Sequence, residues 1–161
     1  MRQAALPFAR RFLIPTDGGP ASAAAARLGL RLARAMGASV LAVSVVDPQV
    51  ARGYAAADLL RYDVRAAAEA QARGAVEAVA RQPRTMGVRC RTVVRHGPVP
   101  ATLLAEARAY RAGLLVMGTR GHTGLKRLVM GSVAAAVAAK APCPALLVPP
   151  AARARRGRKR S

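Results

Sequence analysis

The chain has 161 residues, and its 27 lysines and arginines against 7 aspartates and glutamates give a formal net charge of +20. The length fits one domain, and an aromatic fraction of 3% without tryptophan argues against a stacking platform for single-stranded nucleic acid. The two cysteines, Cys90 and Cys143, form no CxxC pair, so neither a disulfide framework nor a zinc site is indicated, and a reducing compartment is expected.

Short apolar runs alternate along the chain with longer stretches of helical spacing. The strands expected from these runs are, in chain order, residues 12–15, 39–46, 88–95, 114–117 and 145–148. The first helix is predicted between Pro20 and Gly37, with Leu28, Leu32 and Met36 on its apolar face. Further helices are expected over 58–82, where Gly74 interrupts the pattern, over 103–110, and from Val133 to a point before Pro142.

This alternation predicts an α/β fold, a single doubly wound domain in which helices cover both faces of a five-stranded parallel sheet. Ligands of such sheets bind beyond the carboxyl ends of the strands, near the point where strand order reverses. We expect the domain to span residues 1–150 and residues 151–161 to form a basic, disordered tail. No stretch is predicted to be a signal peptide or a membrane span, and a cytoplasmic location is expected.

A glycine-rich segment after the fourth predicted strand carries the densest chemical signal. It spans residues 118–132 and has the pattern G-x2-G-x9-G-S. Glycines let main-chain amides approach a polyphosphate, and Ser132 is expected to cap a helix beginning at Val133. The amino terminus of that helix favours an anion. The chain has neither a G-x4-G-K-[ST] P-loop nor a G-x-G-x-x-G dinucleotide fingerprint.

This segment, together with Ile14 to Gly19 and the triplet Pro142-Cys143-Pro144, resembles the ATP-binding branch of the universal stress protein family. The resemblance covers about residues 10–149. It implies a fold like that of the adenine nucleotide α-hydrolases, ATP as ligand, and a homodimer formed through the last strand, Ala145–Val148. The nucleotide-binding residues that the resemblance implies are Pro15, Thr16, Asp17, Val45, Met117, Gly118, Arg120, Gly121, Gly131, Ser132 and Val133.

The residues alone leave two structural alternatives open. Asp17 follows a predicted strand, where its carboxylate can accept from ribose hydroxyls, but it can instead cap the helix near Pro20. The glycine-rich segment can equally be a plain connection that needs positive φ angles. No residue is nominated as catalytic or as a metal ligand.

Three functions compete at this stage. The leading one is an ATP-binding regulatory module of a stress response, with AMP or a cyclic nucleotide as other adenine ligands. The second is slow ATP hydrolysis assisted by Mg²⁺ or Mn²⁺ on the phosphates, because nearby basic residues can stabilise charge while nothing clearly activates water. The third is non-specific binding of nucleic acid or an anionic surface by the basic tail.

Overall fold

The computed structural model describes residues 10–49, 64–119 and 130–149. The strands are β1 (Arg11–Pro15), β2 (Ser39–Val46), β3 (Cys90–His96), β4 (Leu114–Gly118) and β5 (Ala145–Val148). The helices are α1 (Pro20–Met36), α3 (Val64–Met86), α4 (Val99–Ala109) and α5 (Ser132–Lys140). Strand and helix alternate, as the sequence predicts.

All five strands are parallel and lie in the order β3-β2-β1-β4-β5. Leu13 of β1 pairs with Leu41 of β2 on one side and with Leu115 of β4 on the other, so β1 is the central strand. The chain winds outward from β1 to β3 and then crosses back to β4. The strand order therefore reverses between β1 and β4, which is where this kind of sheet places its ligand.

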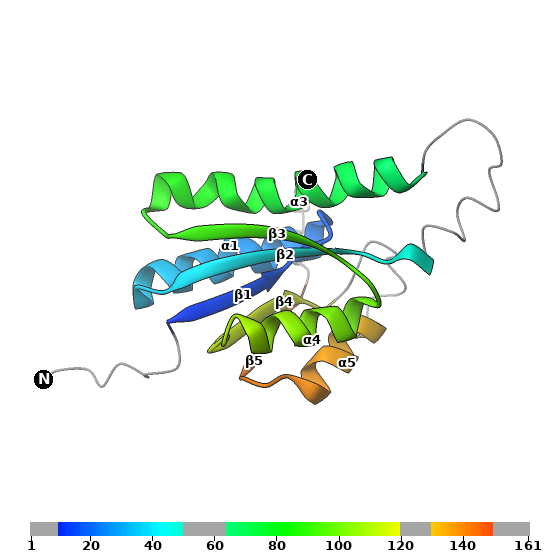
Figure 1. The fold of residues 1–161 in the computed structure, drawn as a ribbon. Helices are drawn as coiled ribbons and strands as arrows, with labels where there is room; N and C mark the ends of the chain where they lie inside the picture. The colour runs from blue at the N-terminus through cyan, green and yellow to red at the C-terminus, as the bar shows by residue number, and fades with distance from the viewer. Residues whose placement is uncertain (1–9, 50–63, 120–129, 150–161) are drawn as a thin grey trace, which may run out of the picture.

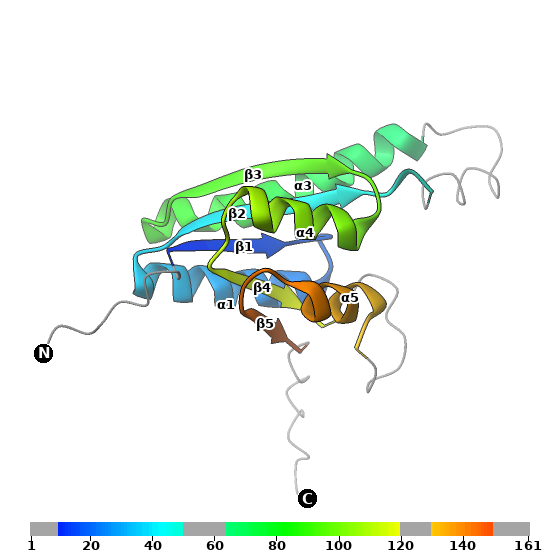
Figure 2. The same ribbon diagram turned by 60° about the horizontal axis from the view of Figure 1, so that its bottom comes forward.

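Two helical layers cover the sheet (Figures 1 and 2). Helices α1 and α3 lie on one face, and α4 and α5 lie on the other. Strand side chains alternate between these layers: Phe12 and Ile14 join the core under α1 and α3, whereas Leu13 and Leu115 join the core under α4 and α5. The predicted doubly wound α/β domain is thus confirmed.

The buried face of α1 is not the predicted one. Met36 is 42% exposed, and Leu28 and Leu32 are only partly buried. Apart from Leu30, the residues that face the sheet are small ones, namely Ala21, Ser22, Ala25, Ala26, Gly29 and Ala33. A Cβ atom at Gly29 would lie 2.8 Å from Cδ1 of Ile14, so the helix approaches the sheet too closely for bulky side chains.

Several boundaries also differ from prediction. Strand β3 begins at Cys90 rather than at Val88, although Val88 is buried beside it. Helix α3 runs to Met86, and Gly74 does not interrupt it, because the tertiary packing of its buried face outweighs one glycine.

The predicted helical residues 58–63 lie outside the described part of the chain. No helix in the described ranges is long and apolar enough to cross a membrane.

Candidate functional site

The chain leaves β1 by a tight turn that leads directly into α1. The N–H of Thr16 donates to the carbonyl of Val43 (2.8 Å) and so extends the pairing of β1 with β2 by one residue. Gly18 follows with φ of +80°, a left-handed conformation that glycine adopts without strain. Its N–H donates to Oγ1 of Thr16 (3.2 Å), and Thr16 is buried. The turn is therefore fixed at the carboxyl end of the central strand.

Asp17 is anchored to the first turn of α1. Its Oδ1 accepts from the N–H of Gly19 (2.8 Å) and from the hydroxyl of Ser22 (2.6 Å). Gly19 is the N-cap residue of α1 and makes no side-chain cap bond, and Asp17 stabilises the turn before the helix. Ser22 is a member of this site that the sequence analysis missed. The sequence feature that could have indicated Ser22 is a hydroxyl residue in the first turn of the helix that follows Asp17.

The end of β4 packs directly against the same turn of α1. A Cβ atom at Gly118 would lie 2.9 Å from the carbonyl carbon of Ala21 and 3.1 Å from the nitrogen of Ser22. Real Cβ atoms essentially never approach backbone so closely, and only glycine fits. Gly118 thus brings the carboxyl end of β4 beside the group that holds Asp17.

The described ends of the glycine-rich segment meet at β4. Thr119 continues beyond the strand and its N–H donates to the carbonyl of Val148 (3.0 Å). The N–H of Gly131 donates to the carbonyl of Thr119 (2.8 Å), so the start of α5 lies next to the end of β4. Arg120 and Gly121 fall in the stretch outside the described residues.

The predicted capping role of Ser132 is wrong. Helix α5 begins at Ser132 itself, and Gly131 is its N-cap with no side-chain hydrogen bond. Gly131 has φ of −62° and ψ of 149°, which other residues also adopt. Its position therefore does not require the positive φ that a plain glycine turn would need.

The remaining predicted contacts lie nearby but differ in exposure. Pro15 is buried and pairs with Val43. Val45, two residues further along β2, is half-buried and packs on the core beneath α4 and α5, as Val133 does. The side chain of Met117 is only 5% exposed and belongs to that core. Around Met117, a ligand would meet the main chain.

Two helices begin at this place from opposite faces of the sheet. Helix α1 starts at Pro20 after β1, and α5 starts at Ser132 after β4. The first amides of any α-helix have no partner within the helix and carry partial positive charge. Helix α1 begins with Pro20, which has no N–H, and the Asp17 carboxylate lies beside its first turn, whereas α5 begins with Ser132.

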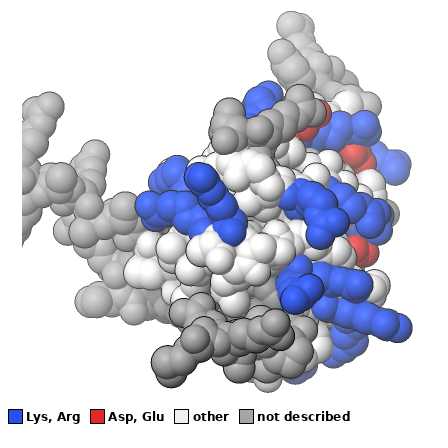
Figure 3. Space-filling view, turned by 90° about the vertical axis from the view of Figure 1, so that its left-hand side faces the viewer, with Lys and Arg blue, Asp and Glu red and all other residues white. Residues whose placement is uncertain are grey.

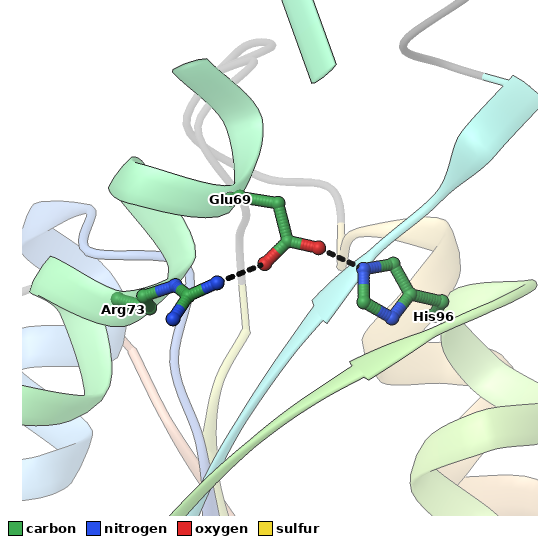
Figure 4. A network of polar contacts seen from close by, with 3 residues as sticks. All are labelled: Glu69, Arg73 and His96. Atoms are coloured by element: carbon green, nitrogen blue, oxygen red, sulfur yellow. Dashed lines mark hydrogen bonds and ion pairs between the residues drawn. The ribbon is translucent and has the colours of Figure 1, made fainter. Parts of the chain in front are cut away.

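A polar network fastens α3 to the carboxyl end of β3 (Figure 4). Glu69 lies between His96 and Arg73 and contacts His96 through Nε2 and Arg73 through Nη2 (3.4 Å). The hydrogen bond from His96 lowers the pKa of Glu69, and the nearby charges of His96 and Arg73 add to this, while desolvation opposes it. His96 is the last residue of β3.

Both cysteines behave as packing residues. Partial burial raises the pKa of Cys90 and of Cys143, which disfavours the reactive thiolate. Cys90 packs against the core beneath α1 and α3, and Cys143 against the opposite core.

The fold is a doubly wound α/β domain with the starts of α1 and α5 after the neighbouring strands β1 and β4. Residues 9–149 match the model of the universal stress protein family, and the chain belongs to that family. It is 35% identical over 140 residues to universal stress protein MJ0531 of Methanocaldococcus jannaschii. The aligned region covers 86% of this chain and 81% of the relative.

Solved structures share the fold at lower sequence identity. The hypothetical protein MJ0577 superimposes with a TM-score of 0.72 at 20% identity, covering 96% of this chain and 99% of its own. A universal stress protein in complex with cAMP has a TM-score of 0.63 at 21% identity, covering 89% and 98%. An Arabidopsis thaliana family member with AMP bound has a TM-score of 0.63 at 16% identity, covering 88% and 92%.

Proposed function

We propose that this chain binds ATP at the carboxyl ends of β1 and β4 and acts as a nucleotide-dependent regulatory module. The observation that carries the proposal is the convergence of two helix amino termini, at Pro20 and Ser132, on the strand switch point. Gly118 lets β4 approach α1 without an intervening side chain, and Gly131 bonds to Thr119 just after β4, so we place both termini at one site.

The site divides into a nucleoside part and a phosphate part. Pro15, Thr16, Asp17, Val45 and the main chain at Met117 form the wall for adenine and ribose. The bonds from Gly19 and Ser22 hold the Asp17 carboxylate in place before any ligand arrives, which lowers the entropy cost of accepting from ribose hydroxyls. The phosphate part consists of Gly118, Arg120, Gly121, Gly131, Ser132 and Val133.

The ligands of structural relatives support an adenine nucleotide. One relative was solved with cAMP and another with AMP. We propose ATP because the glycine-rich segment 118–132 offers main-chain amides over a length that suits several phosphates. Mg²⁺ or Mn²⁺ would then accompany the phosphates as part of the ligand.

We further propose that the chain works in the cytoplasm as a homodimer joined through β5. Strand β5 is an edge of the sheet, and its four residues are only half-buried. An apolar edge strand of this kind favours pairing with a second copy, and Pro149 limits how far the pairing can run. Residues 1–150 form the nucleotide-binding domain, and residues 151–161 add a basic segment able to attract polyanions.

The direct experiment identifies what the protein carries. Mass spectrometry of small molecules released from protein purified without added ligand should detect ATP, and calorimetric titration should rank ATP above AMP, cAMP and adenosine. A protein that binds none of the four would contradict the proposal. Release of ADP in the presence of Mg²⁺, above the rate without protein, would instead indicate the ATPase function.

A further inference from the structure

Arginines gather at the end of the sheet opposite the proposed nucleotide site. We define the amino-end arginines as Arg10, Arg11, Arg34, Arg89, Arg108 and Arg111, all of which are exposed. Backbone hydrogen bonds fix three of them where the strands begin. The carbonyl of Arg10 accepts from Ser39 (2.9 Å), that of Arg11 from Gly113 (2.8 Å), and that of Arg89 from Val40 (2.8 Å).

The other three amino-end arginines come from helix ends. Arg34 lies in the last turn of α1 and Arg108 in the last turn of α4. The N–H of Arg111 donates to the carbonyl of Arg108 (3.0 Å), which keeps the two residues together. Figure 3 looks onto this end of the molecule and shows blue side chains around a white centre, with red side chains confined to the right-hand side.

The described carboxylates lie mostly toward the other end. Asp17 and Asp47 follow the carboxyl ends of β1 and β2. Glu69 contacts His96 and Glu106 contacts Arg95, the last two residues of β3. Among the described residues, none of the amino-end arginines forms an ion pair with a carboxylate. The described ion pairs of the carboxylates therefore involve Arg73, Arg95 and His96 and none of the amino-end arginines.

Helix stability explains only part of this cluster. A cation in the last turn of a helix interacts favourably with the helix dipole, which accounts for Arg34 and Arg108. Arg10 and Arg11 stand at the start of β1, which no described helix precedes. Gathering like charges there costs stability through repulsion, and it produces a positive potential that attracts polyanions.

We propose that the amino-end arginines bind the phosphate backbone of double-stranded nucleic acid. Guanidinium groups recognise phosphate through paired hydrogen bonds better than ammonium groups do. Strands β3 and β1 are two strand spacings apart, about 10 Å, which is comparable to the groove widths of about 6 to 12 Å in B-DNA. Arginines at the starts of both strands therefore reach phosphates across a groove.

The same face lacks the features needed to bind single-stranded nucleic acid or to insert into a lipid surface. The hydroxyl of Tyr110 forms a hydrogen bond with the hydroxyl of Ser39 (2.9 Å), and the guanidinium of Arg11 lies over the Tyr110 ring. The ring is therefore not available to stack on unpaired bases. Met36 is the one large apolar side chain exposed at this end among the described residues, too little to insert into a lipid surface. Contacts to phosphate alone carry no sequence preference.

The test compares two full-length variants of equal charge. In Arg34→Gln/Arg89→Gln/Arg108→Gln, three amino-end arginines are neutralised. In the control, Arg27→Gln/Arg65→Gln/Arg73→Gln, three arginines away from this end are neutralised. Arg11 and Arg111 are kept, since Arg11 bonds the carbonyl of Tyr110 (3.2 Å) and Arg111 has φ of 52°. Fluorescence anisotropy then follows binding of a DNA duplex of about 20 base pairs over a series of salt concentrations.

The logarithm of the DNA-binding constant falls linearly with the logarithm of the salt concentration. Compared with the wild-type chain, the amino-end variant should have a slope smaller in magnitude by about 2 to 3, and the control variant a slope changed by less than about 1. Equal slopes for the two variants, or a wild-type chain that ignores the duplex, would overturn the proposal. So would binding of phosphatidylserine vesicles in place of DNA. Thermal melting confirms folding, and unchanged ATP titration keeps this result separate from the nucleotide site.

Discussion

The hydroxyl of Ser22 donates a 2.6 Å hydrogen bond to Oδ1 of Asp17, and this contact joins the turn after β1 to the first turn of α1. Both partners lie at the strand switch point, where Gly118 of β4 touches the same turn of the helix. The carboxylate thus has a structural role in addition to the ligand contact that we propose for it. Separating these roles requires two variants.

Asp17→Ala should weaken ATP and adenosine by similar factors, because the proposed contact is to the sugar. Ser22→Ala is the matched control, since it removes the bond that holds the carboxylate but keeps the carboxylate itself. We expect each variant to lose about 1 to 3 kcal/mol of folding stability, the range for hydrogen bonds to charged groups. Calorimetric titration of both ligands, with urea unfolding of both variants, measures the two effects.

If Asp17→Ala binds both ligands as the parent does while remaining folded, Asp17 is a structural residue only. A loss for ATP but not for adenosine would move its contact from the ribose to the phosphates.

Gly118→Ala should destabilise the fold by about 1 to 3 kcal/mol, because the added methyl group meets the backbone of Ala21 at 2.9 Å and the backbone must move. Gly74→Ala provides the opposite case within the same chain. A Cβ atom there meets nothing within 4 Å, so the exchange should stabilise α3 by roughly 0.5 to 1 kcal/mol.

Urea unfolding of the two glycine variants at one temperature checks this prediction. A stability for Gly118→Ala equal to that of the parent would show that β4 and α1 are not in the close contact described.

Glu69 should contribute to the loss of stability in acid. Its pKa in the folded protein lies below the ordinary value of 4.5, chiefly because His96 hydrogen-bonds the carboxylate. A lowered pKa contributes stability that is present above the unfolded pKa and is lost as the pH falls through the folded one. Unfolding midpoints measured between about pH 6 and pH 3 should therefore fall less steeply for Glu69→Gln than for the parent.

Glu77→Gln is the control for Glu69, since Glu77 is an exposed carboxylate on the same helix. If the unfolding midpoints of Glu69→Gln and the parent depend on pH in the same way, the contacts of Glu69 do not contribute to stability in acid.

The sequence was sufficient for the fold class and failed where packing is closest, while the position of the binding site stays a prediction. Strand runs and the spacing of helices are local patterns, so the five strands were found almost at their observed bounds. The apolar face of α1 was misplaced because hydrophobicity selects Leu28 and Leu32, whereas the short distance from Gly29 to Ile14 selects small residues. Such a distance depends on tertiary contacts that no local pattern encodes.

The same reasoning explains the errors at the site. Ser132 resembles a helix cap in sequence, but the bond from Gly131 to Thr119 sets the start of α5 one residue earlier. Ser22 was missed because its partnership with Asp17 depends on how α1 leaves the turn. Arg120 and Gly121 stay predictions, because they lie outside the described residues.

The dimer proposal concerns the exposed edge of β5. Light scattering at micromolar protein should give twice the 16.7 kDa mass of the chain. Leu147→Glu would place a charge on the half-buried edge strand and should shift the mass toward the monomer, while Thr92→Glu on the opposite edge strand, β3, should leave it unchanged. A monomer mass for the parent chain would refute this dimer.

The phosphate contacts of the glycine-rich segment can be separated from the nucleoside contacts. Gly121→Val and Gly131→Val should weaken ATP far more than adenosine, because a branched side chain would stand between the main-chain amides and the phosphates. At Gly131 the backbone has negative φ, so valine fits there without conformational strain and a folded variant is expected. Ala139→Val, which adds a branched side chain at an exposed position near the end of the same helix, is the control.

Calorimetric titration of ATP and adenosine against the three variants decides the matter once thermal melting has shown that each is folded. The ratio of ATP to adenosine affinity should fall for both glycine variants and stay near that of the parent for Ala139→Val. If folded Gly131→Val binds ATP as tightly as the parent, the amides at the start of α5 do not hold phosphate, and the segment is only a connection between β4 and α5.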